Sequence, residues 1–193
     1  DLNNGLELKE IAGGLFRNHG YTRDYEDGYP VGYFTSDQGI LKVTPPKDGS
    51  DWQCEKIMDG KVGEVAVLDI DGDGAKEIMT IEEFHGNQIH IYKHINGEYK
   101  RVYTYKNEID FAHTLVATTF RGVPTFLAGV RRVDAEIFYV QYFNGEFVTK
   151  IIDTNVGPAN LNVVNESGID YIIAANHTAN EVAVYEVTEK SNV

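Results

Sequence analysis

The chain has 193 residues, of which 42% are hydrophobic, so it can bury the core of one or two domains. Its 30 acidic and 17 basic side chains leave a formal net charge of −13. A surface this acidic repels phosphate backbones and anionic lipids, which argues against binding to nucleic acid or to a membrane surface. The sequence contains no run of about 18 apolar residues, so no membrane span is predicted.

Glycine and the aromatic residues are frequent, a mixture typical of short strands joined by tight turns. No window shows sustained helical periodicity. The single cysteine, Cys54, excludes an internal disulfide, and its alternating surroundings predict a buried, inert thiol. The chain begins at Asp1 without a recognisable signal peptide, so its compartment stays open. An extracellular or periplasmic location is the hypothesis we keep over a cytoplasmic one.

An internal repeat organises the chain. The turn and strand start at 96–99 (Asn-Gly-Glu-Tyr) recur one unit later at 144–147 (Asn-Gly-Glu-Phe), and the alternating strand at 89–92 recurs at 137–140. Asn-Gly between alternating apolar runs is a strong signal for a β-hairpin. A unit of about 45–50 residues with four short antiparallel strands has the size of one β-propeller blade.

In chain order, the expected elements are one N-terminal strand and four repeat units. The strand covers 6–11, and the units cover about 16–59, 63–107, 111–154 and 158–187. In the second unit, strands are predicted over 64–69, 77–82, 88–93 and 99–105. The sequence therefore predicts an all-β protein, with residues 1–193 forming one β-propeller domain, or part of one, built of four-stranded antiparallel blades.

The fourth unit ends after its third strand, near Val187. The strand over 6–11 follows an Asn-Gly turn, as the fourth strands of other units do, and could supply the missing outer strand. The chain would then close a four-bladed ring. The alternative is that the four blades belong to a larger, seven-bladed propeller.

An acid-rich loop, Asp69–Glu77, joins the first two strands of the second unit. Calcium takes six to eight oxygen ligands, and alternating acids in a short loop can surround one ion, while Gly74 permits the sharp turn. The predicted ligands are Asp69, Asp71, Asp73, the carbonyl of Ala75, and Glu77. Because the loop joins two strands, we expect a structural Ca²⁺ ion; a solvated turn is the alternative. The equivalent loops at 118–122 and 165–168 have lost the acids, so one site is predicted.

The stretch 67–78 resembles the FG-GAP/VCBS propeller repeat, in which this loop binds calcium. More weakly, the segments 80–87, 112–113 and 174–180 resemble the propeller domain of aldos-2-ulose dehydratase-like proteins. Those proteins have seven-bladed propellers and eliminate water from oxidised sugars at a metal-assisted site. The second resemblance therefore implies a lyase activity.

Polar side chains gather at the other end of the predicted blades. In an antiparallel blade, the start of strand one and the end of strand two lie at the same end, opposite the acid-rich loop. In a ring, these positions converge on the mouth of the central channel. The candidate catalytic residues there are His19, Tyr21, Glu83, His85 and His113. The candidate substrate-binding residues are Arg17, Arg131, Arg132, Asn160, Asn176 and His177.

These residue types suit two kinds of chemistry. The three candidate histidines could bind Zn²⁺ or another divalent metal, or act as acid and base near neutral pH. Glu83 could be a metal ligand or a base, and Tyr21 a proton donor. The arginines could hold an anionic or polyhydroxyl substrate through forked hydrogen bonds. Ordinary hydrogen-bonding and surface roles are the alternative for each of them.

Three classes of function remain open. The first is a calcium-stabilised module that binds a carbohydrate or a protein partner through its loops. The second is a metal-assisted lyase, a dehydratase or isomerase acting on an oxidised sugar. The third is a scaffold without a small ligand. An enzyme predicts that the three histidines meet, whereas a lectin-like module predicts scattered histidines and exposed aromatic side chains in the loops.

Overall fold

The computed structural model describes residue 5 and residues 8–188. These residues form fifteen strands, β1–β15, and no helix, so the prediction of an all-β protein is confirmed. Within the described part of the chain, no helix is therefore present that could cross a membrane.

The strands form four antiparallel sheets, each made of strands consecutive in the sequence. The first contains β1 (Tyr21–Glu26), β2 (Tyr29–Ser36), β3 (Gly39–Thr44) and β4 (Gln53–Met58). The second contains β5 (Glu64–Leu68), β6 (Glu77–Glu82), β7 (Gln88–Ile95) and β8 (Glu98–Thr104). The third contains β9 (Ile109–Phe120), β10 (Val123–Val133), β11 (Ile137–Phe143) and β12 (Glu146–Asp153). The fourth contains β13 (Pro158–Glu166), β14 (Ile169–Asn176) and β15 (Glu181–Glu186).

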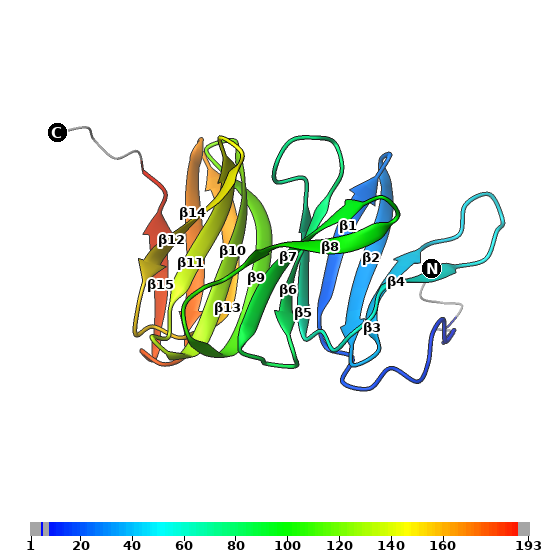
Figure 1. Ribbon diagram of the computed structural model, residues 1–193, viewed down its shortest axis with the longest axis horizontal. Coiled ribbons are helices and arrows are strands. Elements are labelled where there is room, and N and C mark those ends of the chain that lie inside the picture. Colours follow the sequence, from blue (N-terminus) through cyan, green and yellow to red (C-terminus); the bar gives the residue numbers. More distant parts are fainter. Residues whose placement is uncertain (1–4, 6–7, 189–193) are drawn as a thin grey trace.

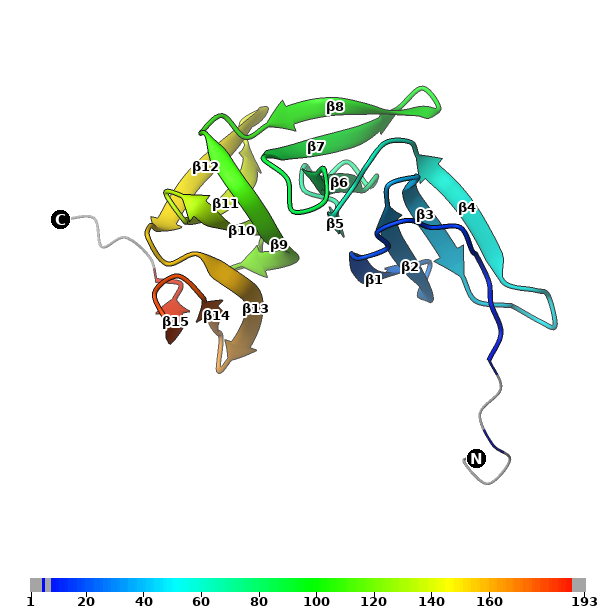
Figure 2. The same ribbon diagram turned by 90° about the horizontal axis from the view of Figure 1, so that it is seen from below.

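The four sheets are the blades of a β-propeller, as predicted. Seen along the propeller axis, they are arranged side by side in an arc (Figure 2). The first strands β1, β5, β9 and β13 line the inside of the arc, and β4, β8 and β12 lie at its outer rim (Figure 2). Each blade therefore presents its first strand to the axis.

The Asn-Gly pairs found in the sequence form the turns that were expected of them. Asn96 and Gly97 have φ angles of 53° and 88°, and Asn144 and Gly145 have 52° and 87°. Two successive residues with positive φ are characteristic of a two-residue hairpin turn, which asparagine and glycine tolerate best. These turns connect the third and fourth strands of the second and third blades.

Apolar packing fills each of the three spaces between successive blades. Val31, Ile40 and Ile78 are among the buried residues shared by the first and second blades. Phe126 and Phe138 of the third blade are fully buried, and Tyr105 stacks on Phe138 with ring centroids 3.8 Å apart. A further buried group joins the third blade to the fourth. Because each contact is large and apolar, it fixes the position of one blade relative to the next.

The N-terminal strand expected over 6–11 is not formed by its described residues. Leu6 and Glu7 lie outside the described residues, and residues 8–11 are not in a strand. Lys9 contacts Asp51 at 3.1 Å, so this segment lies beside the first blade and far from β15 (Figures 1 and 2). The described residues therefore leave the fourth blade with three strands.

Cys54 is exposed, so the prediction of a buried thiol was wrong. It lies on β4, the outermost strand of the first blade, where residues 53–56 are all exposed. An alternating sequence shows that a segment is a strand, but it does not show whether another sheet covers that strand.

Candidate functional site

Two groups of polar side chains lie at opposite ends of the second blade. The acid-rich loop connects β5 to β6 at one end, and the connection between β6 and β7 lies at the other (Figure 1). This separation follows from the antiparallel order of the strands, as the sequence predicted.

Three histidines from three different blades meet at the second end. His19 precedes β1, His85 lies between β6 and β7, and His113 lies on β9. The rings of His85 and His113 are stacked with centroids 4.9 Å apart, and the His19 ring lies 5.0 Å from His85 and 6.3 Å from His113. We call these three residues the histidine cluster. The structure thus brings together all three candidate catalytic histidines.

Two phenylalanines that the sequence analysis did not select border the histidine cluster. The Phe84 ring stacks on His85 at 4.1 Å and meets the edge of His19 at 5.0 Å. The Phe111 ring lies 4.6 Å from His85. The available signal was an aromatic side chain next to, or two residues from, a candidate histidine: Phe84 precedes His85, and Phe111 lies on β9 two residues before His113. With these rings, the cluster offers flat apolar surfaces beside polar nitrogens.

Both arginines of β10 approach the same ring. The guanidinium carbons of Arg131 and Arg132 lie 4.8 Å and 4.6 Å from the centroid of Phe111, which places both within the range of a cation–π interaction. Arg132 also pairs with Asp110 at 3.2 Å. Arg131 is therefore the arginine whose charge lies next to the histidine cluster without such a partner among the described residues.

The environment keeps two of the histidines neutral. Burial lowers the pKa of His85 to about 4, and the neighbouring His113, His19 and Arg131 act in the same direction. Burial and the Arg131 charge also lower the pKa of His113, although its hydrogen bond to the backbone of Ala159 opposes the shift. Neutral imidazoles can donate and accept hydrogen bonds, so both suit a polar ligand near pH 7.

Glu64, the first residue of β5, lies next to His19. The sequence analysis did not select it as a candidate. Its Oε2 atom lies 4.0 Å from Nδ1 of His19. A Cβ atom on Gly20 would lie 2.7 Å from Oε1 of Glu64, so the glycine leaves the room that this carboxyl occupies. Burial raises the pKa of Glu64 to about 7, and the hydrogen bond from the Val65 amide opposes this shift. The signal in the sequence was an acid at the start of an otherwise apolar inner strand.

Three other candidates lie less centrally. Arg17 lies 3.7 Å from Asp37, with its guanidinium 5.8 Å from the centre of the Phe84 ring. Glu83 is exposed and pairs with Lys61 at 3.1 Å. Tyr21 packs its ring 4.9 Å from Phe34. The ring of Tyr21 lines a hollow of about 330 Å³ on the first blade, together with Ile11 and Trp52. The structure does not place Tyr21 in contact with the histidine cluster.

The three candidate residues from the fourth blade have different surroundings. Asn176 is buried and donates hydrogen bonds to Glu181 at 2.9 Å and to Tyr185 at 3.1 Å, which is a structural role. Asn160 is exposed, and its side chain accepts a hydrogen bond from the next backbone amide. His177 is exposed but close enough to lower the pKa of His113. Of the three, His177 has the clearest link to the cluster.

The two ends of the second blade differ in whether their side chains lie close enough together to bind one metal ion. Among the described residues, Asp69, Asp71 and Glu77 form the group whose ligand atoms all lie within 4.8 Å of one another. The histidine cluster does not meet this condition, because its rings face one another through their planes and edges. Zinc at the histidine cluster stays a prediction that would require the rings to rotate.

The acid-rich loop is held by its own carboxylates. Asp69 accepts hydrogen bonds from the amides of Gly72 at 2.8 Å and Gly74 at 3.0 Å, and the buried Glu77 accepts one from Ile70 at 3.1 Å. The Lys93 ammonium contacts Asp71, lies 2.7 Å from Asp73, and lies 3.3 Å from Glu77. A cation is therefore favourable here, and burial raises the pKa of Glu77. The amide of Ala75 donates to Asp73 at 2.9 Å.

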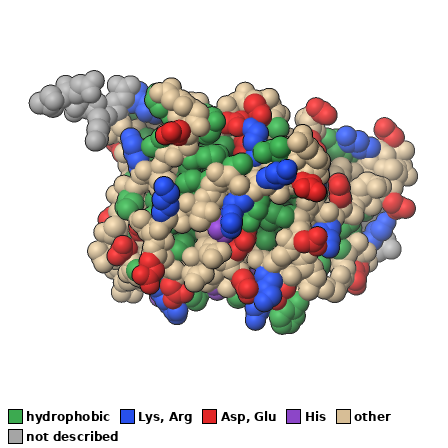
Figure 3. Space-filling view, viewed as in Figure 1, with side chains coloured by type: hydrophobic (Ala, Val, Ile, Leu, Met, Phe, Trp, Pro, Cys, Tyr) green, Lys and Arg blue, Asp and Glu red, His purple; other side chains and the backbone are tan. Residues whose placement is uncertain are grey.

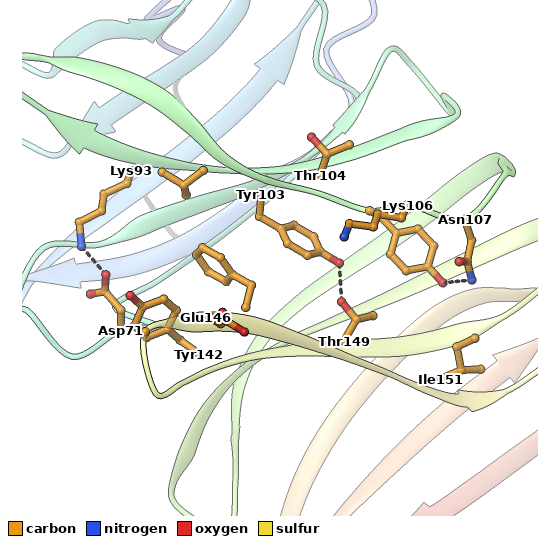
Figure 4. A pocket seen from close by; sticks show the side chains of 14 residues that line it. Asp71, Lys93, Tyr103, Thr104, Lys106, Asn107, Tyr142, Glu146, Thr149 and Ile151 are labelled. Carbon is orange, nitrogen blue, oxygen red and sulfur yellow. Dashed lines mark hydrogen bonds and ion pairs between the residues drawn. The ribbon is translucent and has the colours of Figure 1, made fainter.

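A groove of about 930 Å³ runs between the outer strands of the second and third blades (Figure 4). Tyr103, Tyr142 and Phe147 line it, and Tyr103 shares a hydrogen bond of 2.7 Å with Thr149. On the surrounding face, acidic and basic side chains are interspersed and apolar side chains emerge between them (Figure 3). At one end the groove reaches the acid-rich loop, since Asp71 and Lys93 also line it.

Replacing Glu64 with Gln should change how stability depends on pH. Because the pKa of Glu64 is higher in the folded protein, the unfolded chain loses this proton first as the pH rises from about 4.5 to about 7. The contribution of Glu64 to the free energy of unfolding is therefore fully present below pH 4.5 and is lost as the pH rises to 7. With 19% of the side chain exposed, we expect the Glu64→Gln variant to gain about 1–3 kcal/mol relative to wild type across this range.

Urea unfolding of both proteins at pH 4.5, 6 and 8 measures this difference. Glu98→Gln, at an exposed position of β8, controls for the loss of one negative charge. A difference between Glu64→Gln and wild type that stays constant with pH would contradict the assignment of a buried, protonated carboxyl.

Comparison with known proteins supports the fold and little more. No family model and no curated protein matches the sequence, so the resemblance to the FG-GAP/VCBS repeat depends on the residues quoted for it. Among solved structures, the chain is similar to a 6-phosphogluconolactonase-like protein from Bacteroides uniformis, with a TM-score of 0.63 and 16% sequence identity. The match covers 91% of this chain and 52% of the other, so the chain spans about half the length of that protein. This likeness shows that the chain has the β-propeller fold.

Proposed function

We propose that the protein is a binding module that takes a carbohydrate at the histidine cluster. The observation that carries this proposal is the meeting of His19, His85 and His113, from three blades, between the rings of Phe84 and Phe111. Loops held on a rigid scaffold are the usual place for a binding site.

The chemistry of the cluster suits a sugar better than a protein surface. Aromatic rings offer flat apolar surfaces to the C–H faces of a sugar, and neutral imidazoles exchange hydrogen bonds with its hydroxyls. Nε2 of His85 and Nδ1 of His113 are buried without hydrogen-bond partners, and leaving such atoms unpaired is costly. A sugar substrate is also named for the fold neighbour, the 6-phosphogluconolactonase-like protein.

The double replacement of His85 and His113 by Ala should abolish carbohydrate binding and leave the fold intact. We expect the affinity for the best ligand of a monosaccharide and sugar-acid panel to fall at least about tenfold, because two hydrogen-bonding groups are lost. Isothermal titration calorimetry measures the affinity and circular dichroism the fold. His94→Ala, at an exposed position of β7, is the matched control. Unchanged affinity in a folded double variant would sink the proposal.

A second candidate is a lyase acting on an oxidised sugar, and the position of Glu64 favours it. A carboxyl with a pKa near 7, 4.0 Å from an imidazole, can exchange protons at neutral pH. In such a reaction one member of the Glu64–His19 pair would remove the proton next to a carbonyl. The other member would donate a proton to the departing hydroxyl, which leaves as water. Turnover of a 2-keto sugar to an unsaturated product that is lost in Glu64→Gln would favour the lyase over the binding module.

For the acid-rich loop we propose a structural Ca²⁺ ion. Three carboxylates within 4.8 Å of one another, one of them buried, provide the hard oxygen ligands that calcium takes. The ligands would be Asp69, Asp71, Asp73, the Ala75 carbonyl and Glu77. The Lys93 ammonium contacts the same acids, so calcium would have to displace it from them.

Asp71→Ala should remove one equivalent of calcium and the stabilisation that it supplies. In wild type we expect one Ca²⁺ per chain by mass spectrometry, and a melting temperature that rises with calcium and falls with chelator, because an ion that binds the folded state alone stabilises it. The variant should show neither response. Asp48→Ala, at an exposed turn of the first blade, is the control. A wild-type melting temperature indifferent to both calcium and chelator would contradict the site.

A further inference from the structure

A guanidinium without an acidic partner lies beside the histidine cluster. Nε of Arg131 is buried and lacks a hydrogen-bond partner, as do Nε2 of His85 and Nδ1 of His113. Other arginines nearby are paired, Arg132 with Asp110 at 3.2 Å and Arg17 with Asp37 at 3.7 Å. Among the described residues, Arg131 has no such ion pair. The structure therefore leaves one positive charge uncompensated at this place, in a chain with a net charge of −13.

Arg131 is held in position rather than free in solvent. Its guanidinium lies 4.8 Å from the centre of the Phe111 ring, and its backbone carbonyl accepts a hydrogen bond of 3.2 Å from Thr178 on the fourth blade. Its charge also reaches His85 and His113, because it lowers the pKa of both. A fixed cation beside two neutral imidazoles attracts an anion and repels a second cation, which argues against a metal ion at this position.

We infer that Arg131 binds a negatively charged group, a carboxylate or a phosphate, on the sugar that the histidine cluster takes. The guanidinium presents N–H donors in a fork that matches either group. This inference rests on the proposed carbohydrate function and names the class of ligand more closely. The ligand is a sugar acid or a sugar phosphate.

The histidines can bind the uncharged hydroxyl groups of such a ligand, and His113 shows how. The hydrogen bond between His113 and the backbone of Ala159 raises the pKa of His113, as expected when the imidazole is the donor. In the neutral ring the other nitrogen, Nδ1, is then an acceptor, and it is the one without a partner. A sugar hydroxyl can donate to it while the charged substituent of the same sugar contacts Arg131.

Calorimetric titration with D-glucose, D-glucuronate and D-glucose 6-phosphate tests the inference on wild type, Arg131→Gln and Arg101→Gln. Arg101 lies at an exposed position of β8 and controls for the loss of one positive charge. We expect wild type and Arg101→Gln to bind at least one charged sugar about tenfold or more tightly than glucose. Arg131→Gln should lose the preference, so that its affinities for glucose and for the charged sugar become similar. Whichever charged sugar is preferred identifies the group as carboxylate or phosphate.

Three results would overturn the inference, and they differ in what they say of the proposed function. If glucose binds as tightly as both charged sugars, the anion site is wrong and the carbohydrate function stands. If none of the three binds, both fail. A preference that persists in Arg131→Gln would assign the anion to another cation and also overturn the inference. Arg131→Lys, which keeps the charge, separates loss of the cation from loss of folding, since it should retain part of the preference.

Discussion

The apolar packing between successive blades is the constraint on which the site depends. Each of the three spaces between blades is filled by buried side chains from both sheets, with Phe126 and Phe138 fully buried between the second and third blades. This packing fixes the distance from blade to blade. His19, His85 and His113 lie far apart in the sequence, yet their rings meet at one end of the arc: His85 stacks on His113, and His19 approaches His85 edge-on.

The same antiparallel order separates two kinds of electrostatic environment. At one end, Asp69, Asp71 and Glu77 gather negative charge that Lys93 partly balances. At the other, burial and a nearby guanidinium favour neutral imidazoles. A cation therefore suits the acid-rich loop, and a polar or anionic ligand suits the histidine cluster. We propose a stabilising role for the first and a recognition role for the second.

The fold could be predicted from the sequence because the turn and strand patterns that specify it are local and recur among the repeat units. The Asn96-Gly97 and Asn144-Gly145 turns mark equivalent hairpins, and strand direction alone places the histidines and the acid-rich loop at opposite ends. What could not be predicted depends on contacts between blades. Burial of Glu64 requires the space left by Gly20, and Phe111 becomes part of the site only because the second and third blades are neighbours.

Two sequence-based expectations did not hold. An alternating pattern indicates a strand, but it does not show which other strands lie against that strand. Cys54 alternates as an inner residue would, yet it lies on an uncovered outer strand. Residues 8–11 resemble a fourth strand, but the Lys9–Asp51 contact places them beside the first blade.

The most direct test of the account is the protonation state of the histidine cluster. Two-bond ¹H–¹⁵N spectra of ¹⁵N-histidine protein, recorded from pH 8 to pH 4 and assigned with single His→Gln variants, resolve each imidazole. We expect His85 to remain neutral at pH 6 and to protonate only near pH 4, and His113 to have a pKa below its ordinary value of 6.5. Ordinary titration of both residues near pH 6.5 would show that the rings are solvated and apart, and would contradict a shared site.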